Sequence, residues 1–124
     1  MHDILFTMAK LLIIDDERGI RNTLKEILSD EGHQVDVAEN GAQGLEMAQG
    51  TSYDLIFSDI KMPGMDGMEL LAHLKGQSDK GQSAKDDSDP IDCPVVMITG
   101  HGDVETAVQA LKLGAYDFLL KPLD

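Results

Sequence analysis

Carboxylate, hydroxyl and ammonium side chains stand at the C-terminal ends of four short apolar runs in this sequence. Asp15 and Asp16 follow the first run, Asp59 ends the second, Thr99 ends the third and Lys121 follows the fourth. Adjacent carboxylates repel each other, and burying either of them is costly unless a cation neutralises the charge. Hard oxygen ligands of this kind suit Mg²⁺, which usually takes one or two carboxylates and keeps several waters. These residue types predict a divalent-cation site with a hydroxyl and an amine beside it.

Strands and helices that alternate along the chain must position these residues. Apolar runs predict strands at 10–14, 33–39, 53–59, 94–100 and 116–122, and helical spacing predicts helices at 17–32, 40–50, 68–75 and 103–115. This alternation predicts a parallel α/β sheet with right-handed crossovers. Ligands in such sheets bind beyond the carboxyl ends of the strands, which lie about 5 Å apart. The reactive strand ends should therefore converge on one pocket.

Each of these residues also has a purely structural interpretation. Asp15 suits the N-cap of the first helix, and Asp59 suits a turn before Pro63. Thr99 could be an ordinary strand residue, and Lys121 could be a solvated surface charge. These alternatives require four coincidences, whereas one shared pocket explains all of the residues.

Composition limits the partners and the compartment. The chain has 124 residues, enough for one domain, and a formal charge of −13. This charge argues against direct binding to nucleic acid or to an anionic membrane. The single cysteine, Cys93, cannot form an internal disulfide and fits a reducing cytoplasm. No apolar run approaches the roughly 20 residues of a membrane span, and residues 1–9 are interpreted as a short N-terminal arm.

The segment 76–92 interrupts the alternation of strands and helices. It is rich in Gly, Ser, Gln, Asp and Lys and has almost nothing to bury, so it cannot repay the entropy of ordering. Connections in such folds usually have about 2–6 residues. We therefore expect a flexible insertion within a single domain that spans 1–124. A partner contact that orders on binding is the alternative.

Four motifs together resemble the receiver domain of two-component response regulators. They are "IIDDE", "DLIFSDIKMPGMDG", "VVMITG" and "FLLKP", in this order and at similar spacing from Lys10 onward. The stretch "TGHGDVETAVQALKLGAYDFLLKP" resembles more narrowly the receivers of sigma-54-dependent transcriptional activators. The resemblance implies a doubly wound, five-stranded parallel sheet of the flavodoxin-like kind, with strand order 2-1-3-4-5.

The resemblance also implies a role for each strand-end residue. Asp59 would be the phosphoacceptor and would attack a phosphohistidine of a sensor histidine kinase. Thr99 would hydrogen-bond one phosphoryl oxygen, and the Lys121 ammonium would pair with another. The ligands of Mg²⁺ would be Asp15, Asp16, Asp59 and the backbone carbonyl of Lys61.

A receiver is a signalling module that catalyses its own phosphorylation and dephosphorylation, not a turnover enzyme in the usual sense. The implied partners are the sensor kinase, the output domains of a longer transcription regulator and a second copy in a homodimer, without direct binding to nucleic acid or membrane. Phosphorylation would move Thr99 and, through Phe118, change the surface around 104–118. Family members have a fifth helix after the lysine-proline turn, which is missing from this chain because it stops at Asp124. We therefore expect exposed apolar residues on the fourth and fifth strands.

Two other classes of function compete with this interpretation. A metal-dependent phosphohydrolase with an Asp nucleophile often carries Asp-x-Asp after its first strand, whereas this chain has Asp-Asp-Glu there and a single Asp59 later. A pseudo-receiver that acts only as an interaction module would be expected to lack an acidic or lysine position, and none is lost. The sequence therefore favours the phosphoacceptor.

Overall fold

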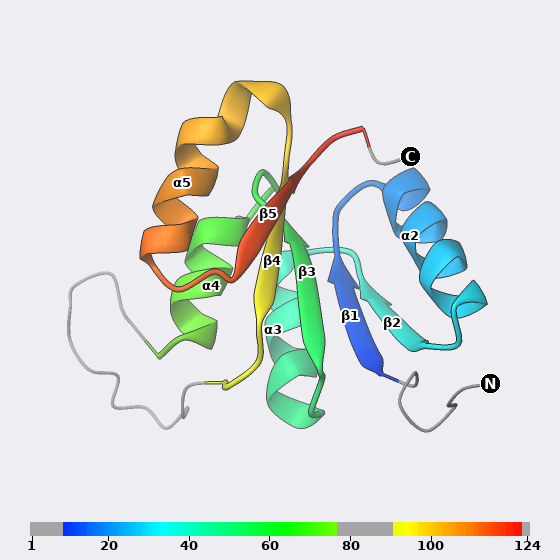
Figure 1. The fold of residues 1–124 in the computed structure, drawn as a ribbon. Helices are drawn as coiled ribbons and strands as arrows, with labels where there is room; N and C mark the ends of the chain where they lie inside the picture. The colour runs from blue at the N-terminus through cyan, green and yellow to red at the C-terminus, as the bar shows by residue number, and fades with distance from the viewer. Residues whose placement is uncertain (1–8, 77–90, 123–124) are drawn as a thin grey trace.

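A computed structural model describes residues 9–76 and 91–122 (Figure 1). Nearly all of the expected N-terminal arm (1–9) and of the expected insertion (76–92) lies outside the described residues. The elements are β1 (Lys10–Ile14), α2 (Arg18–Asp30), β2 (Gln34–Ala38), α3 (Gly41–Gly50), β3 (Leu55–Asp59), α4 (Gly67–Leu74), β4 (Val95–Thr99), the 3₁₀ turn η1 (His101–Asp103), α5 (Val104–Lys112) and β5 (Asp117–Leu120). All predicted strands and helices are confirmed, and η1 is an addition.

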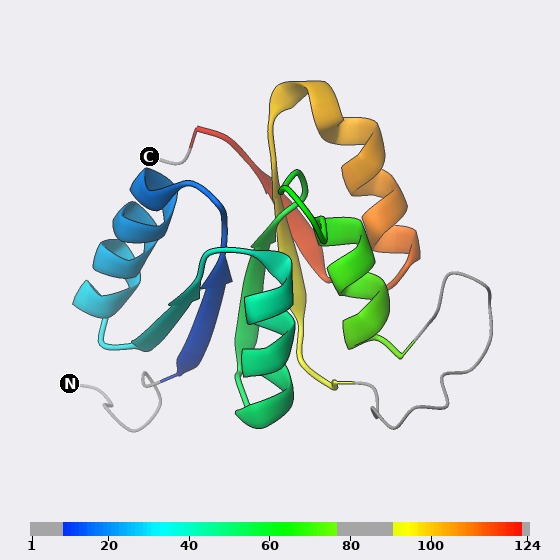
Figure 2. The same cartoon turned by 180° about the vertical axis from the view of Figure 1, so that it is seen from behind.

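The five strands form one parallel sheet in the order β2-β1-β3-β4-β5. Helices α3, α4 and α5 cover one face and α2 covers the other (Figures 1 and 2). Along β1, Leu12 and Ile14 pack toward the three helices, whereas Leu11 and Ile13 pack toward α2. Strands that are covered on both faces read as continuous apolar runs, as predicted. The α/β fold class and the strand order are both confirmed.

The face that carries α2 tests the expectation of exposed apolar strands. Val96 and Ile98 of β4 are only 7% and 0% exposed, whereas Leu119 beside Ile98 on β5 is 38% exposed. The expectation is thus wrong for the fourth strand and confirmed for the fifth. The physical reason is position in the sheet, because β4 lies between β3 and β5 while β5 is an edge strand.

The loops at the carboxyl edge of the sheet are held by caps at the helix starts. Asp66 forms a capping box with Glu69 at the start of α4, and the Asn40 side chain accepts a hydrogen bond from the Gln43 amide at the start of α3. These caps fix where the β2–α3 and β3–α4 loops cross the strand ends. Within the described ranges, no helix is long and apolar enough to cross a membrane.

Candidate functional site: an acidic pocket at the carboxyl edge of the sheet

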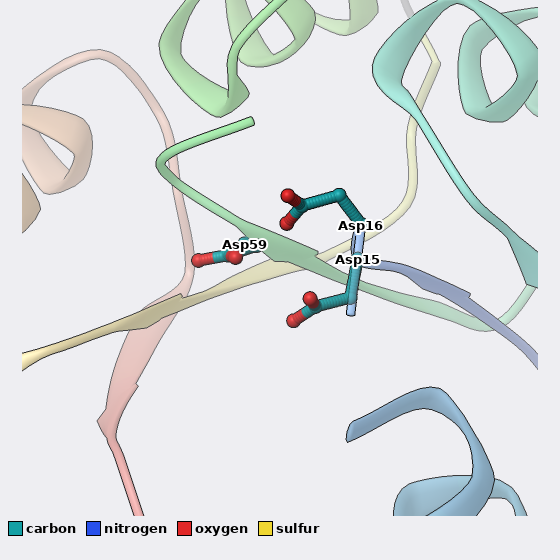
Figure 3. A group of neighbouring side chains, drawn as sticks. All are labelled: Asp15, Asp16 and Asp59. Atoms are coloured by element: carbon teal, nitrogen blue, oxygen red, sulfur yellow. The ribbon is translucent and has the colours of Figure 1, made fainter. Parts of the chain in front are cut away.

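Three carboxylates meet where β1 and β3 end. Asp15 and Asp16 directly follow β1, and Asp59 is the last residue of β3. One oxygen of each carboxylate lies within 4.8 Å of the other two, and Figure 3 shows all three groups directed into the same space. Asp15 is 0% exposed and Asp59 is 5% exposed, while Asp16 is exposed to solvent. The predicted convergence of these three residues is confirmed.

Backbone hydrogen bonds extend the strands just far enough to bury two of these carboxylates. The Asp15 amide donates to the Ala38 carbonyl of β2 at 3.2 Å, so Asp15 continues β1 beyond its last apolar residue. The Ile60 amide donates to the Ile98 carbonyl of β4 at 3.1 Å and fixes the peptide that follows Asp59. These bonds anchor the backbone at both strand ends and so fix the positions from which the two carboxylates project.

Gly67, the first residue of α4, packs directly against the end of β3. Its amide donates to the Ile60 carbonyl at 2.8 Å. A Cβ atom at this position would lie 2.2 Å from the Asp59 carbonyl oxygen and 2.8 Å from the Ile60 Cα, both backbone atoms. Only glycine therefore allows α4 to approach the end of β3 this closely.

Lys121 brings a positive charge into the acidic pocket. Its amide donates to the Thr99 carbonyl at 2.8 Å, and the Lys121–Pro122 peptide is cis. Its Nζ lies 3.2 Å from Asp59 Oδ2 and 3.9 Å from Asp15 Oδ2. The same Nζ lies 3.4 Å from Glu17 Oε1, a contact that the sequence did not single out. The predicted convergence of Lys121 with the carboxylates is confirmed.

Burial and charge pull the pKa values of these groups in opposite directions. Burial raises the pKa of Asp15 from 3.8 to about 6, and the negative charges of Asp59 and Asp16 add to this effect. Burial also raises the pKa of Asp59, against the opposing effect of Lys121. Burial lowers the pKa of Lys121, but attraction to Asp15 and Asp59 outweighs it and leaves the pKa above its usual value. For Asp15 and Asp59, the loss of solvation on burial thus outweighs the stabilisation of their charged forms by Lys121.

The residues of the pocket fit a divalent cation. The Oδ1 atom of Asp15 accepts a hydrogen bond from the Glu17 amide at 2.9 Å, but Oδ2 is buried and has no hydrogen-bond partner among the described residues. A buried carboxylate oxygen without a partner is costly, and a cation coordinated by it would remove the cost. The all-oxygen donor set is the one that Mg²⁺ prefers.

Thr99 and Lys61 reach the pocket edge but point their side chains elsewhere. Thr99 is 1% exposed, and its hydroxyl donates to the carbonyl oxygens of Gly100 at 3.2 Å and Asp103 at 3.3 Å. In the part of the chain that the structure describes, this hydroxyl makes no hydrogen bond to Asp59. The Lys61 Nζ forms an ion pair of 3.1 Å with Asp103.

Three contributors to this edge were missed from the sequence. They are Glu17, Gly67 and Asp103. Glu17 directly follows the acidic pair, so its position was a signal for it. Gly67 and Asp103 act through distant backbone and side-chain contacts, for which a single sequence carries no local signal.

Comparison with known proteins identifies the family. Residues 11–124 match the family model "Response regulator receiver domain". The chain is 36% identical over 118 residues to the transcriptional regulatory protein FixJ of Bradyrhizobium diazoefficiens, covering 95% of this chain and 52% of FixJ. It is 43% identical over 115 residues to the C4-dicarboxylate transport transcriptional regulatory protein DctD of Pseudomonas aeruginosa, covering 92% of this chain and 22% of DctD.

A solved structure supports the same assignment. The receiver domain of NtrX from Brucella abortus superimposes with a TM-score of 0.75 at 40% identity, covering 92% of this chain and 87% of that one. DctD and NtrX carry receivers of the sigma-54 activator type, so the narrower resemblance also holds. The chain spans about half of FixJ and about a fifth of DctD. It belongs to the response regulator receiver domain family, a family of two-component signalling modules rather than classical enzymes.

Proposed function

We propose that this domain takes a phosphoryl group from a phosphohistidine of a sensor histidine kinase onto Asp59. The observation that carries the proposal is the grouping of three carboxylates within 4.8 Å, with the Lys121 ammonium 3.2 Å from one of them. An isolated nucleophilic carboxylate would repel an anionic phosphoryl group. A pocket with one fixed cation and oxygen ligands for a second lowers that repulsion.

The transfer is a substitution at phosphorus. A carboxylate oxygen of Asp59 attacks the phosphorus atom, the new O–P bond forms as the P–N bond breaks, and the electron pair stays on the imidazole nitrogen. Mg²⁺, when bound, would neutralise part of the negative charge on the phosphoryl oxygens. Its proposed ligands are Asp15, Asp16, Asp59 and the backbone carbonyl of Lys61.

Two further side chains complete the proposed reaction. The Lys121 ammonium, already beside Asp59, would turn to pair with one phosphoryl oxygen. The Thr99 hydroxyl would leave its present carbonyl acceptors and donate to another phosphoryl oxygen. Both contacts stabilise charge that is absent before the transfer, so they favour the phosphorylated state.

The output surface is proposed to be the α5–β5 side of the molecule. Its exposed apolar residues are Val104, Val108, Leu111, Leu113, Tyr116 and Leu120, and Tyr116 is 71% exposed. Several large apolar side chains exposed on one helix and the strand beside it favour binding to another protein. We propose that it contacts an output domain of a longer transcription regulator or a second copy in a homodimer, in the cytoplasm, and that Phe118 transmits the movement of Thr99 to it.

Intact-mass spectrometry with a small phosphodonor tests the proposal. The protein is incubated with Mg²⁺ and acetyl phosphate, and one added phosphoryl group is expected. Asp59→Asn and chelation should each abolish the adduct, whereas Asp92→Asn, at an exposed position outside the pocket, should not. Release of phosphate from a general phosphoester without an adduct would favour a phosphohydrolase. Absence of both reactions would favour a plain interaction module.

A further inference from the structure

Asp103 is fixed at three of its atoms. Its amide donates to the Gly100 carbonyl at 3.0 Å, which closes the turn η1. Its own carbonyl accepts from the Thr99 hydroxyl at 3.3 Å. Its Oδ1 lies 3.1 Å from Lys61 Nζ. One residue therefore connects the hydroxyl at the end of β4 to a lysine in a different loop.

Lys61 belongs to the loop that follows the phosphoacceptor strand. It stands two residues after Asp59, so its ion pair with Asp103 ties the β3–α4 loop to η1. The Asp103 side chain is 19% exposed and that of Lys61 is 76% exposed. An ion pair at such a position is modest in strength. Its acidic partner, however, also accepts a hydrogen bond from the buried Thr99 hydroxyl.

We propose that Lys61 and Asp103 are positioning residues that hold η1 in this arrangement and thereby retain the Thr99 hydroxyl away from the phosphoacceptor. A hydroxyl has one proton to donate, so Thr99 cannot serve a phosphoryl oxygen and the Gly100 and Asp103 carbonyls together. Breaking the ion pair lowers the cost of releasing η1. The kinetic consequence rests on the proposed function, whereas the restraint on η1 does not.

Two variants with opposite changes in charge should both increase the rate of phosphorylation. Lys61→Met removes a positive charge, keeps the backbone carbonyl and frees η1, while Asp103→Asn removes a negative charge and also frees it. Both should phosphorylate about two- to fivefold faster than the parent with acetyl phosphate and Mg²⁺, the range that an exposed pair supports. If the two residues acted only through their charge on an anionic donor, Lys61→Met would be slower and Asp103→Asn faster, and the proposal would be overturned.

Thr99→Ala tests whether the effect passes through the hydroxyl. In this background neither second substitution should change the remaining phosphorylation rate, because the group that the ion pair restrains is gone. Equal acceleration with and without the Thr99 hydroxyl would contradict the proposal. Lys25→Met, which removes an exposed lysine on α2, is the matched control and should leave the rate at the parent value.

Hydrogen exchange in the unphosphorylated protein separates this proposal from the proposed function. In Lys61→Met the Asp103 amide should exchange about two- to fivefold faster, since η1 opens more often. The Ile60 amide, which bonds to the Ile98 carbonyl in the sheet, should be unchanged. An unchanged Asp103 amide would overturn the proposal. Faster exchange in a protein that no donor phosphorylates would uphold the restraint and refute the proposed function.

Discussion

Replacing Asp15 by Asn should stabilise the protein in the absence of divalent cations. Asp15 is fully buried, its Oδ2 has no hydrogen-bond partner among the described residues, and its pKa is raised from 3.8 to about 6. At 1.36 kcal/mol per unit of pKa, holding this group charged costs about 3 kcal/mol. The Asn side chain removes the charge and retains an oxygen to accept from the Glu17 amide, as Oδ1 does at 2.9 Å.

The sign of the pH dependence follows from the direction of the pKa change. The folded pKa of Asp15 lies above the unfolded value, so its contribution to stability is fully present below about pH 4 and is lost as the pH rises through about 6. The advantage of Asp15→Asn should be about 3 kcal/mol at pH 7.5 and about 1 kcal/mol at pH 4.5. Neutral pH is therefore where the parent protein has the most to gain from a bound cation.

Urea unfolding with a chelator present measures this difference. Free energies of unfolding are compared at the two pH values for the parent, for Asp15→Asn and for the exposed control Asp92→Asn, at equal m-values. Adding Mg²⁺ at pH 7.5 should stabilise the parent as a ligand of the folded state and stabilise Asp15→Asn less. An Asp15→Asn variant that is no more stable than the parent at pH 7.5, or whose advantage does not shrink at pH 4.5, would show that burial of the Asp15 charge does not destabilise the fold.

Three other substitutions test separate parts of the structure. Gly67→Ala should lower the free energy of unfolding in urea by about 1–3 kcal/mol, because its Cβ would meet the Asp59 carbonyl. A Cβ at Gly19 would have no neighbour within 4 Å, so the control Gly19→Ala should not destabilise the protein. Equal effects of the two substitutions would contradict the close packing at Gly67. Replacing residues 77–90 by a short Gly-Ser linker should raise the free energy of unfolding by about 1 kcal/mol, because closing a shorter loop costs less entropy. The chain on either side is already joined by a 2.7 Å hydrogen bond from the Ile91 amide to the Leu74 carbonyl, so a short linker can span the gap. A lowered thermal midpoint would show that the segment stabilises the fold. Lys121→Gln should slow phosphorylation by acetyl phosphate about tenfold to a hundredfold, and an unchanged initial rate would remove this residue from the reaction.

The sheet and the acidic pocket were predictable because they depend on local pattern and simple topology. Continuous apolar runs identified β1, β3 and β4, and the rule that parallel strands end at one edge placed Asp15, Asp16 and Asp59 together. Covering helices on both faces of the sheet explain why these runs are continuous instead of alternating.

The orientation of the Thr99 side chain was not predictable in the same way. Its position at the end of β4 follows from the sequence, but its hydroxyl has two nearby backbone acceptors, the Gly100 and Asp103 carbonyls, that compete with the pocket. The contact of Lys121 with Glu17 spans more than a hundred residues of sequence, and it depends on where the β5 end passes the start of α2. Such contacts are set by tertiary geometry, not by spacing along the chain.

Chemical mapping of the phosphorylated carboxyl group shows directly whether Asp59 is the phosphoacceptor. After incubation with Mg²⁺ and acetyl phosphate, borohydride reduces an aspartyl phosphate to homoserine, and tandem mass spectrometry of the peptides locates it. We expect homoserine at Asp59 and unmodified Asp15 and Asp16, with no conversion when Mg²⁺ is chelated. Homoserine at position 15 or 16, or conversion that is independent of the cation, would contradict a pocket in which the three carboxylates hold a metal and Asp59 alone accepts the phosphoryl group.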